Sequence, residues 1–239
     1  MCAHGPRDDA GFDITALRVL LVADLLARTA ELRGLQVLTV LLRTGQSPAQ
    51  TTAFERDADA LGIHPPAAHR SYEPPLGGPI DVHVIGHGAS LDAAWGGRFM
   101  SVGIAHARGA GSGDAAAAED LIAEHRHDPL VVRLALISFP YHRPADLTAD
   151  VLTSARGTLG HWRHRVAEWA ESPSEPMPAR ITEMAGAAFD NLDAVSALAL
   201  LRGLAVEESV PAGAKFETFV FADRILGLDL ARGIGQLHA

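Results

Sequence analysis

The sequence is poor in cysteine, lysine and aromatic residues, and each shortage limits which bonds, core or charged groups the protein can have. Its single cysteine is Cys2, so no disulfide can form within the chain, and we expect a reducing, cytoplasmic location. Aromatic residues make up only 5% of the 239 residues although hydrophobic residues make up 48%. The core must therefore consist mainly of Ala, Leu and Val. The one lysine is Lys215, so almost all cationic side chains are arginines.

An excess of basic residues and a long apolar run are also missing. The net charge is −9, which argues against a general nucleic-acid-binding surface. The most apolar stretch, residues 19–42, is interrupted by Asp24, Arg28 and Glu31, which are costly in hydrocarbon. Residues 1–6 have neither the basic start nor the apolar run of a signal peptide. We therefore expect a globular protein that does not enter a membrane.

Hydrophobic periodicity divides the chain into an α/β half and a helical half. The first half is predicted to contain a helix over 16–33, a strand over 36–42, a helix over 49–61, a loop over 67–79, a strand over 80–85, a helix over 91–107 and a loop over 108–114. The second half is predicted to contain helices over 115–126, 129–139, 148–171, 178–203 and 211–226. Gly34 and Gly62 are expected to end the first two helices in the left-handed conformation. We predict one domain over 1–128 and a second over 129–239.

Four groups of residues, in the same order, resemble cysteinyl-tRNA synthetase and its relative, the cysteine ligase of the mycothiol pathway. They are Gly5 to Leu26, Ala53 to Pro66, Asp128 to Pro144, and the pair Asp190–Asp193 and Asp223–Leu230. The last pair includes the most specific passage, Asp-Arg-Ile-Leu-Gly-Leu-Asp-Leu. The resemblance implies a Rossmann-like nucleotidylyl-transferase domain of the class I synthetase type, followed by an α-helical bundle.

The catalytic motifs of that family are not present at the matching positions. The family's His-Ile-Gly-His motif falls on Asp13, Ile14, Thr15 and Ala16, and its lysine loop falls on residues 107–111, where Arg108 is the only cation. Adenylate formation gathers negative charge on the α-phosphate, so catalysis depends on positive groups placed there. We therefore predict no catalytic residues and no charging of tRNA.

The family's zinc site is not expected either. Its four ligands fall on His4, on a stretch missing between Ala67 and Ile80, on Ala93 and on Gly97. One ligand cannot form a tetrahedral zinc site. The sequence also has no counterpart of the anticodon-binding domain after Gly235, so tRNA is not an expected partner.

A nucleotide-facing strand end is the remaining candidate site. Asp81, His83 and Gly86 match the family's Asp-x-His-Gly-Gly-Gly, while Val84 and Ile85 replace two glycines and should obstruct a close approach by adenosine. The predicted residues around ATP or an adenylate are His4, Gly5, Asp13, Thr15, Asp81, His83, Gly86 and Arg108. The alternative interpretation is a structural strand end without a ligand.

Two histidine-rich segments have structural interpretations. Residues 161–165 contain His161, Arg163, His164 and Arg165, which could contact an RNA backbone but fit a solvated helix face better. His125, near a predicted helix end, suits the negative end of the helix dipole.

Three functional hypotheses follow. The first is a pseudoenzyme that binds a nucleotide, an adenylate, an amino acid or a partner. The second is a small ATP-dependent cysteine ligase or adenylating enzyme with an altered site. The third is a protein-interaction module whose helical half binds another protein or a second copy of the chain.

Overall fold

A five-stranded parallel sheet forms the first part of the molecule. The computed structural model describes residues 1–5, 12–71, 80–89, 95–107 and 118–235. The strands are β1 (Cys2–His4), β2 (Val40–Leu42), β3 (Ala68–Arg70), β4 (Val82–Gly86) and β5 (Arg98–Val102), in the order β3-β2-β1-β4-β5. Every adjacent pair is parallel. This order confirms the predicted Rossmann-like α/β class.

Two helices connect the first three strands. Helix α1 (Ile14–Leu32) begins at Asp13, and α2 (Pro48–Ala60) begins at Ser47, where Ser47 and Gln50 form a capping box. Just beyond the helix ends, Gly34 and Gly62 have φ of 80° and 66°, as predicted. Parallel neighbours need such crossovers, so the helix–strand alternation fixes the sheet topology.

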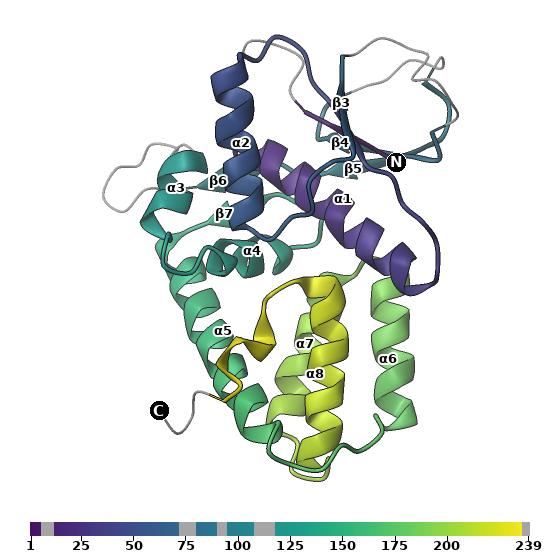
Figure 1. Cartoon of the computed structure of the whole chain (residues 1–239), viewed down its shortest axis with the longest axis vertical. Helices are drawn as coiled ribbons and strands as arrows, with labels where there is room; N and C mark the ends of the chain where they lie inside the picture. Colours follow the sequence, from purple (N-terminus) through teal and green to yellow (C-terminus); the bar gives the residue numbers. More distant parts are fainter. Residues whose placement is uncertain (6–11, 72–79, 90–94, 108–117, 236–239) are drawn as a thin grey trace.

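Helix α1 is the central element of the fold. Its buried side chains, such as Leu17 and Val19, belong to the same core cluster as Ala3 and Val84 of the sheet. It also contacts helix α8 (Ala212–Leu226), and Figure 1 shows it lying between the sheet and the bundle. A helix buried on two sides has to be apolar around most of its circumference, which explains the long hydrophobic stretch seen in the sequence.

The second part of the chain is mostly helical. Its elements are α3 (Ala118–Glu124), α4 (Leu130–Ile137), α5 (Ala149–Trp169), α6 (Ala179–Asp190), α7 (Ala194–Val206), α8 and the 3-10 helix η2 (Leu230–Gly233). Strand β7 (Ala145–Leu147) pairs in parallel with β6 (Ala105–Ala107) as a separate two-stranded sheet. In Figure 1, α5 to α8 stand side by side below the sheet. In the described part of the chain, no helix combines the length and apolar character of a membrane crossing.

Several predicted elements were wrong in type or extent. Described residues of the predicted helix over 91–107 form β5 and β6, because Gly96 and Gly97 have φ of 60° and 73° and cannot continue a helix. The predicted helix over 178–203 is split into α6 and α7 at Leu192, whose φ is 52°. The predicted strand over 36–42 is strand only from Val40, and β3 lies in the predicted loop.

The predicted domain division at residue 128 stays a prediction. One hydrophobic cluster contains core residues from both sides of it, for example Leu21 of α1 and Leu136 of α4. The β6–β7 pair also joins the two parts of the chain.

Candidate functional site

The candidate site lies where β1 and β4 end, at the carboxyl edge of the sheet. The chain leaves β1 toward β2 on one side, whereas β4 adds on the other side, so the strand order reverses between β1 and β4. Ligands of open α/β sheets bind outside the strand ends at such a reversal. The structure places His4, Gly5 and Gly86 at these strand ends, because β1 and β4 are adjacent. His83 lies near the start of β4, opposite Cys2, and its side chain reaches that of His4.

His4 and His83 form a buried pair on the sheet face opposite α1. Side chains alternate along a strand, and Ala3 and Val84 point to the α1 side. His4 Nε2 lies 2.9 Å from His83 Nδ1, and the two residues are 5% and 0% exposed. One of these two nitrogens must be unprotonated for the bond to form. Burial lowers the pKa of His83, although the Trp95 backbone partly opposes the effect.

Aromatic rings surround the histidine pair. The His83 ring stacks on Phe99 with centroids 5.2 Å apart, and Trp95 meets both imidazoles edge-on at 5.7 and 5.9 Å. A charge on either imidazole would be poorly solvated there. The pair therefore suits a neutral structural contact better than the stabilisation of phosphate charge.

The first turn of α1 is occupied by its own side chains. The Asp13 carboxylate accepts a hydrogen bond from the Ala16 N–H at 2.8 Å and caps the helix. The Thr15 hydroxyl accepts from the Ala105 N–H at 3.1 Å and donates to the Ala105 carbonyl at 3.2 Å. Thr15 thus joins α1 to β6. Both side chains that replace the family's histidine motif therefore bind the protein's own backbone.

The remaining predicted residues lie at different places. The Gly5 N–H donates to the Leu42 carbonyl at 2.8 Å, and a β-carbon there would lie 3.1 Å from the same oxygen. At Gly86 a β-carbon would make only an ordinary contact with Val19. Asp81 precedes β4 and so lies at the opposite edge of the sheet from Gly86. Arg108 lies outside the described residues.

The residues that replace the family's glycines fill the sheet interior. Val84 is fully buried and Ile85 is 7% exposed. Val84 packs in the core under α1, whereas Ile85, one residue on, points to the other face. A larger side chain at each position occupies space that backbone alone would leave to a ligand.

Arg18 of α1 is a cation that sequence analysis did not assign to the site. It is 1% exposed, and no carboxylate among the described residues pairs with it. Its guanidinium instead donates to the carbonyl oxygens of Gly103, Ile104, Phe139, Pro140 and Arg143. Burial lowers its pKa to about 10, so it stays charged at neutral pH. A single arginine within an otherwise apolar stretch of a helix is a sequence signal for a buried guanidinium that binds several backbone carbonyls.

Arg43 is a second cation that sequence analysis missed. It follows β2 directly, and its N–H donates to the Arg70 carbonyl at 3.0 Å. Its β-carbon lies 3.8 Å from the position that a β-carbon on Gly5 would take. Its Nε is buried and makes no hydrogen bond to the described residues. Arg43 therefore brings a positive charge to the carboxyl edge of the sheet from a strand that the family motifs do not include.

The passages that carry the resemblance meet at another place, a joint between α1, α4 and the end of α8. Arg133 is fully buried and pairs with Asp24 at 2.8 Å. Its guanidinium also donates to the Leu226 carbonyl at 2.6 Å and the Leu61 carbonyl at 3.0 Å. A β-carbon on Gly227 would lie 2.8 Å from Arg133 Nη2, so this position needs glycine.

The Asp-Arg-Ile-Leu-Gly-Leu-Asp-Leu passage is the turn that closes this joint. The Asp223 carboxylate accepts hydrogen bonds from the N–H groups of Leu228 at 2.7 Å and Leu230 at 2.8 Å. Burial raises the pKa of Asp223, and the two N–H donors act in the opposite direction. Gly227 has φ of 62°, which allows the chain to turn back. The most specific family-like passage therefore holds the fold together.

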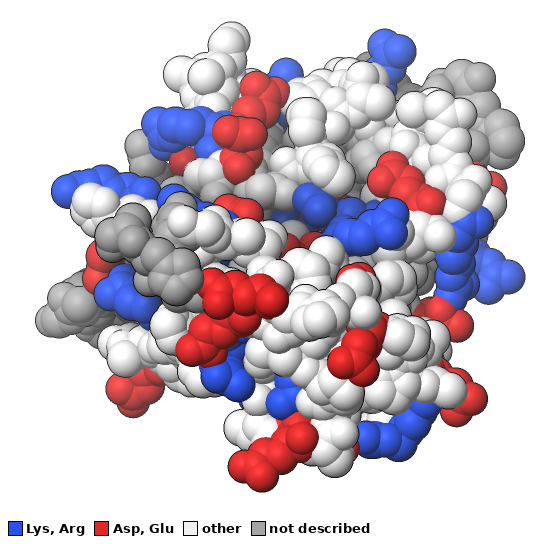
Figure 2. All heavy atoms as spheres, turned by 60° about the horizontal axis from the view of Figure 1, so that its bottom comes forward, with Lys and Arg blue, Asp and Glu red and all other residues white. Residues whose placement is uncertain are grey.

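One basic residue on α5 has a different role from the predicted one. Arg163 pairs with Asp128 and donates to the carbonyls of Leu228 at 2.8 Å and Asp229 at 3.0 Å. The prediction of a solvated face was therefore wrong for Arg163. His125 behaves as predicted, since its Nδ1 is hydrogen-bonded to the Leu121 carbonyl at the end of α3. On the face shown in Figure 2, basic and acidic side chains of the described residues are interspersed.

Among the residues that the structure describes, no three His, Cys, Asp or Glu side chains are close enough to hold a metal ion together. The prediction that the chain does not have the family's zinc site stays a prediction.

The fold and this sheet edge define a Rossmann-like α/β protein with a helical part. No known family model matches the chain. It is similar to proteins named L-cysteine:1D-myo-inositol 2-amino-2-deoxy-α-D-glucopyranoside ligase. The one from Thermobispora bispora is 35% identical over 106 residues, and the one from Streptosporangium roseum is 34% identical over 108. The one from Saccharopolyspora erythraea is 37% identical over 73.

These matches cover 44%, 43% and 30% of this chain. They cover 26%, 26% and 17% of the three ligases, so the matched part spans about a quarter or less of each relative. The resemblance to the cysteine ligase related to cysteinyl-tRNA synthetase is thereby confirmed.

Proposed function

We propose that the chain is a non-catalytic relative of these cysteine ligases, which keeps their scaffold and does not activate cysteine with ATP. The observation that carries this proposal is that the polar groups at the sheet edge form hydrogen bonds within the protein itself. Asp13 caps α1, Thr15 binds Ala105, and His4 and His83 bind each other. Groups already bonded in the folded state cannot turn to a phosphate without a cost.

Electrostatics supports the same conclusion. Attack on the α-phosphate needs positive groups that are placed before the reaction begins. The start of α1 instead carries the Asp13 carboxylate, and two like charges about 4 Å apart repel by about 4 kcal/mol at an intermediate dielectric. The Arg18 guanidinium donates to five backbone carbonyls, so its hydrogen-bond donors are already used within the protein.

Cysteine-dependent exchange of pyrophosphate into ATP tests this proposal. The protein should be purified free of host synthetase, and an active cysteine ligase should serve as the positive control. We expect no exchange above the rate without cysteine. Exchange that requires cysteine and copurifies with this chain would refute the proposal.

Nucleotide binding without catalysis is a second candidate, and Arg43 favours it. The Arg43 Nε makes no hydrogen bond to the described residues, and the Arg43 β-carbon lies next to Gly5 at the edge where phosphates of a nucleotide would approach. A ligand that binds only the native state raises the apparent stability. We expect millimolar ATP to raise the melting temperature of the wild type and of Arg156→Gln, an exposed control, but not of Arg43→Gln. The absence of any shift in the wild type would remove this candidate.

A further inference from the structure

A cavity of about 370 Å³ lies on the α1 side of the sheet, between α1, α2 and strands β2 and β3. Its floor is apolar and is made by Leu20, Leu41, Phe54 and Ile63, each at most 4% exposed. This volume is within the range of small-molecule sites, and such sites are typically apolar with a few polar groups placed at the rim.

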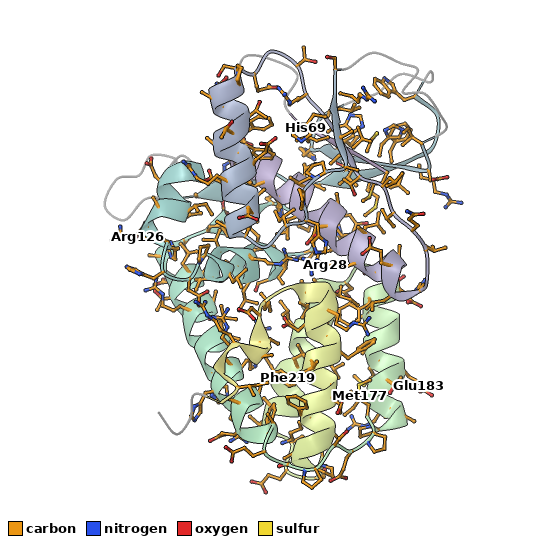
Figure 3. The ribbon with its side chains drawn as sticks, viewed as in Figure 1. Arg28, His69, Arg126, Met177, Glu183 and Phe219 are labelled. Atoms are coloured by element: carbon orange, nitrogen blue, oxygen red, sulfur yellow. The ribbon has the colours of Figure 1, made fainter. Side chains whose placement is uncertain are left out.

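The rim of this cavity is acidic. Glu55 and Asp59 are four residues apart on α2 and so lie on one face of the helix. His69 of β3, labelled in Figure 3, stands opposite, with its Nδ1 3.3 Å from Glu55 Oε1. Among the described residues, no arginine or lysine lies within ion-pairing distance of either carboxylate. The rim therefore offers two carboxylates that form no ion pair with an arginine or lysine in the described part of the chain.

The cavity has its own lining but lies near the carboxyl edge of the sheet. The Phe54 ring forms part of its floor and stacks on Phe12, with centroids 3.9 Å apart and planes at 16°. Phe12 also lies next to Gly5, where a β-carbon would come within 3.2 Å of its ring. None of the described residues predicted to surround ATP or an adenylate lines the cavity.

We propose that this cavity binds a small organic amine with a flat apolar body. The apolar body would lie on the side chains of Leu20, Phe54 and Ile63, and the ammonium group would lie between Glu55 and Asp59. Hydrogen bonds between an ammonium donor and a carboxylate are stronger than neutral ones. A carboxylate on the same body would be repelled by the rim, and this makes the sign of the ligand's charge the decisive property.

Three compounds that share one indole body test the proposal: tryptamine, the neutral tryptophol and the anionic indole-3-acetate. Binding is followed on the full chain by the backbone amide NMR shifts of Ala58, Ile63 and His69. We expect tryptamine to bind at least about tenfold more tightly than indole-3-acetate at low salt, with tryptophol between them, because each step changes the charge that meets the rim.

Variants separate the two parts of the site. Glu55→Gln with Asp59→Asn should reduce the preference for tryptamine to less than about threefold. Ala58→Phe should fill the cavity and abolish the binding of all three compounds. Glu183→Gln, a control on the exposed side of α6 labelled in Figure 3, should change neither result. Folding of each variant is checked by its amide spectrum.

Two outcomes would overturn the proposal. One is equal or tighter binding of indole-3-acetate by the wild type. The other is the absence of shifts at Ala58, Ile63 and His69 at millimolar tryptamine.

Discussion

The sheet edge at β1 and β4 and the joint around Arg133 are both built from family-like segments, but they differ in what the polar side chains do. At the joint, Arg133 connects α1 and α8 to α4 through Asp24 and the Leu226 carbonyl, and Asp223 holds the turn that follows α8. At the sheet edge, Asp13 and Thr15, the positions predicted to match the family's histidine motif, bind backbone groups of the protein itself.

This difference separates polar side chains that hold several helices together from polar side chains that cap a helix or link two backbone segments. A buried charge such as Arg133 is costly to remove because its partners would be left unpaired. A catalytic side chain at the surface of the sheet can be exchanged for a helix cap at little cost to stability. The two regions should therefore respond very differently to substitution.

The largest expected effect is at the joint. Arg133→Met removes the partner of Asp24 and the donor to the Leu226 and Leu61 carbonyls. We expect the free energy of unfolding to fall by about 3–5 kcal/mol, measured by urea denaturation. The control is Arg33→Met, which breaks the exposed Arg33–Asp190 pair and should cost less than about 1 kcal/mol. Equal effects of the two substitutions would contradict this account of the joint.

Arg18→Met should have the next largest effect. It removes a guanidinium that donates to the carbonyls of Gly103, Pro140 and Arg143, so we expect a loss of about 2–4 kcal/mol. Thr15→Val removes the smaller link between α1 and Ala105 and should cost about 1–1.5 kcal/mol. An Arg18→Met protein no less stable than Thr15→Val would show that the carbonyls find other donors.

The sequence predicted the elements whose signals are local. Helices α1 and α2 combine helical periodicity with glycines that adopt positive φ, and both were found near their expected bounds. Strands β6 and β7 are three residues long, and they pair residues that are 40 positions apart, such as Ala105 with Ala145. No local sequence pattern predicts such a pair. Gly96 and Gly97, which adopt positive φ, were the signal that a helix does not run through this region.

The site was only partly predictable for the same reason. The family motifs placed His4 and His83 each near a strand end, but their 2.9 Å contact depends on the register that sets Cys2 opposite His83. Most residues that line the proposed amine cavity lie between Phe54 and Pro66, but the cavity is completed by Leu20, Leu41 and His69, which are distant in the sequence.

The smallest expected effect concerns the pH dependence of stability at the sheet edge. Because burial lowers the pKa of His83, the unfolded state binds a proton at a higher pH than the folded state does. Stability from this residue is therefore fully present above the unfolded histidine pKa of about 6.5 and is lost as the pH falls below it. One proton contributes at most about 1.4 kcal/mol per pH unit to the slope.

The measurement is the free energy of unfolding between pH 8 and pH 5 for the wild type, His83→Phe and His161→Phe. Phenylalanine keeps a ring against Phe99 and cannot titrate, so His83→Phe should flatten the decline below pH 6.5 whatever its stability at pH 8. His161 is exposed on α5, so its substitution should leave the slope unchanged. An unaltered slope in His83→Phe would mean that His83 gains its proton in the folded protein as easily as in water, and that the buried pair opens at the sheet edge.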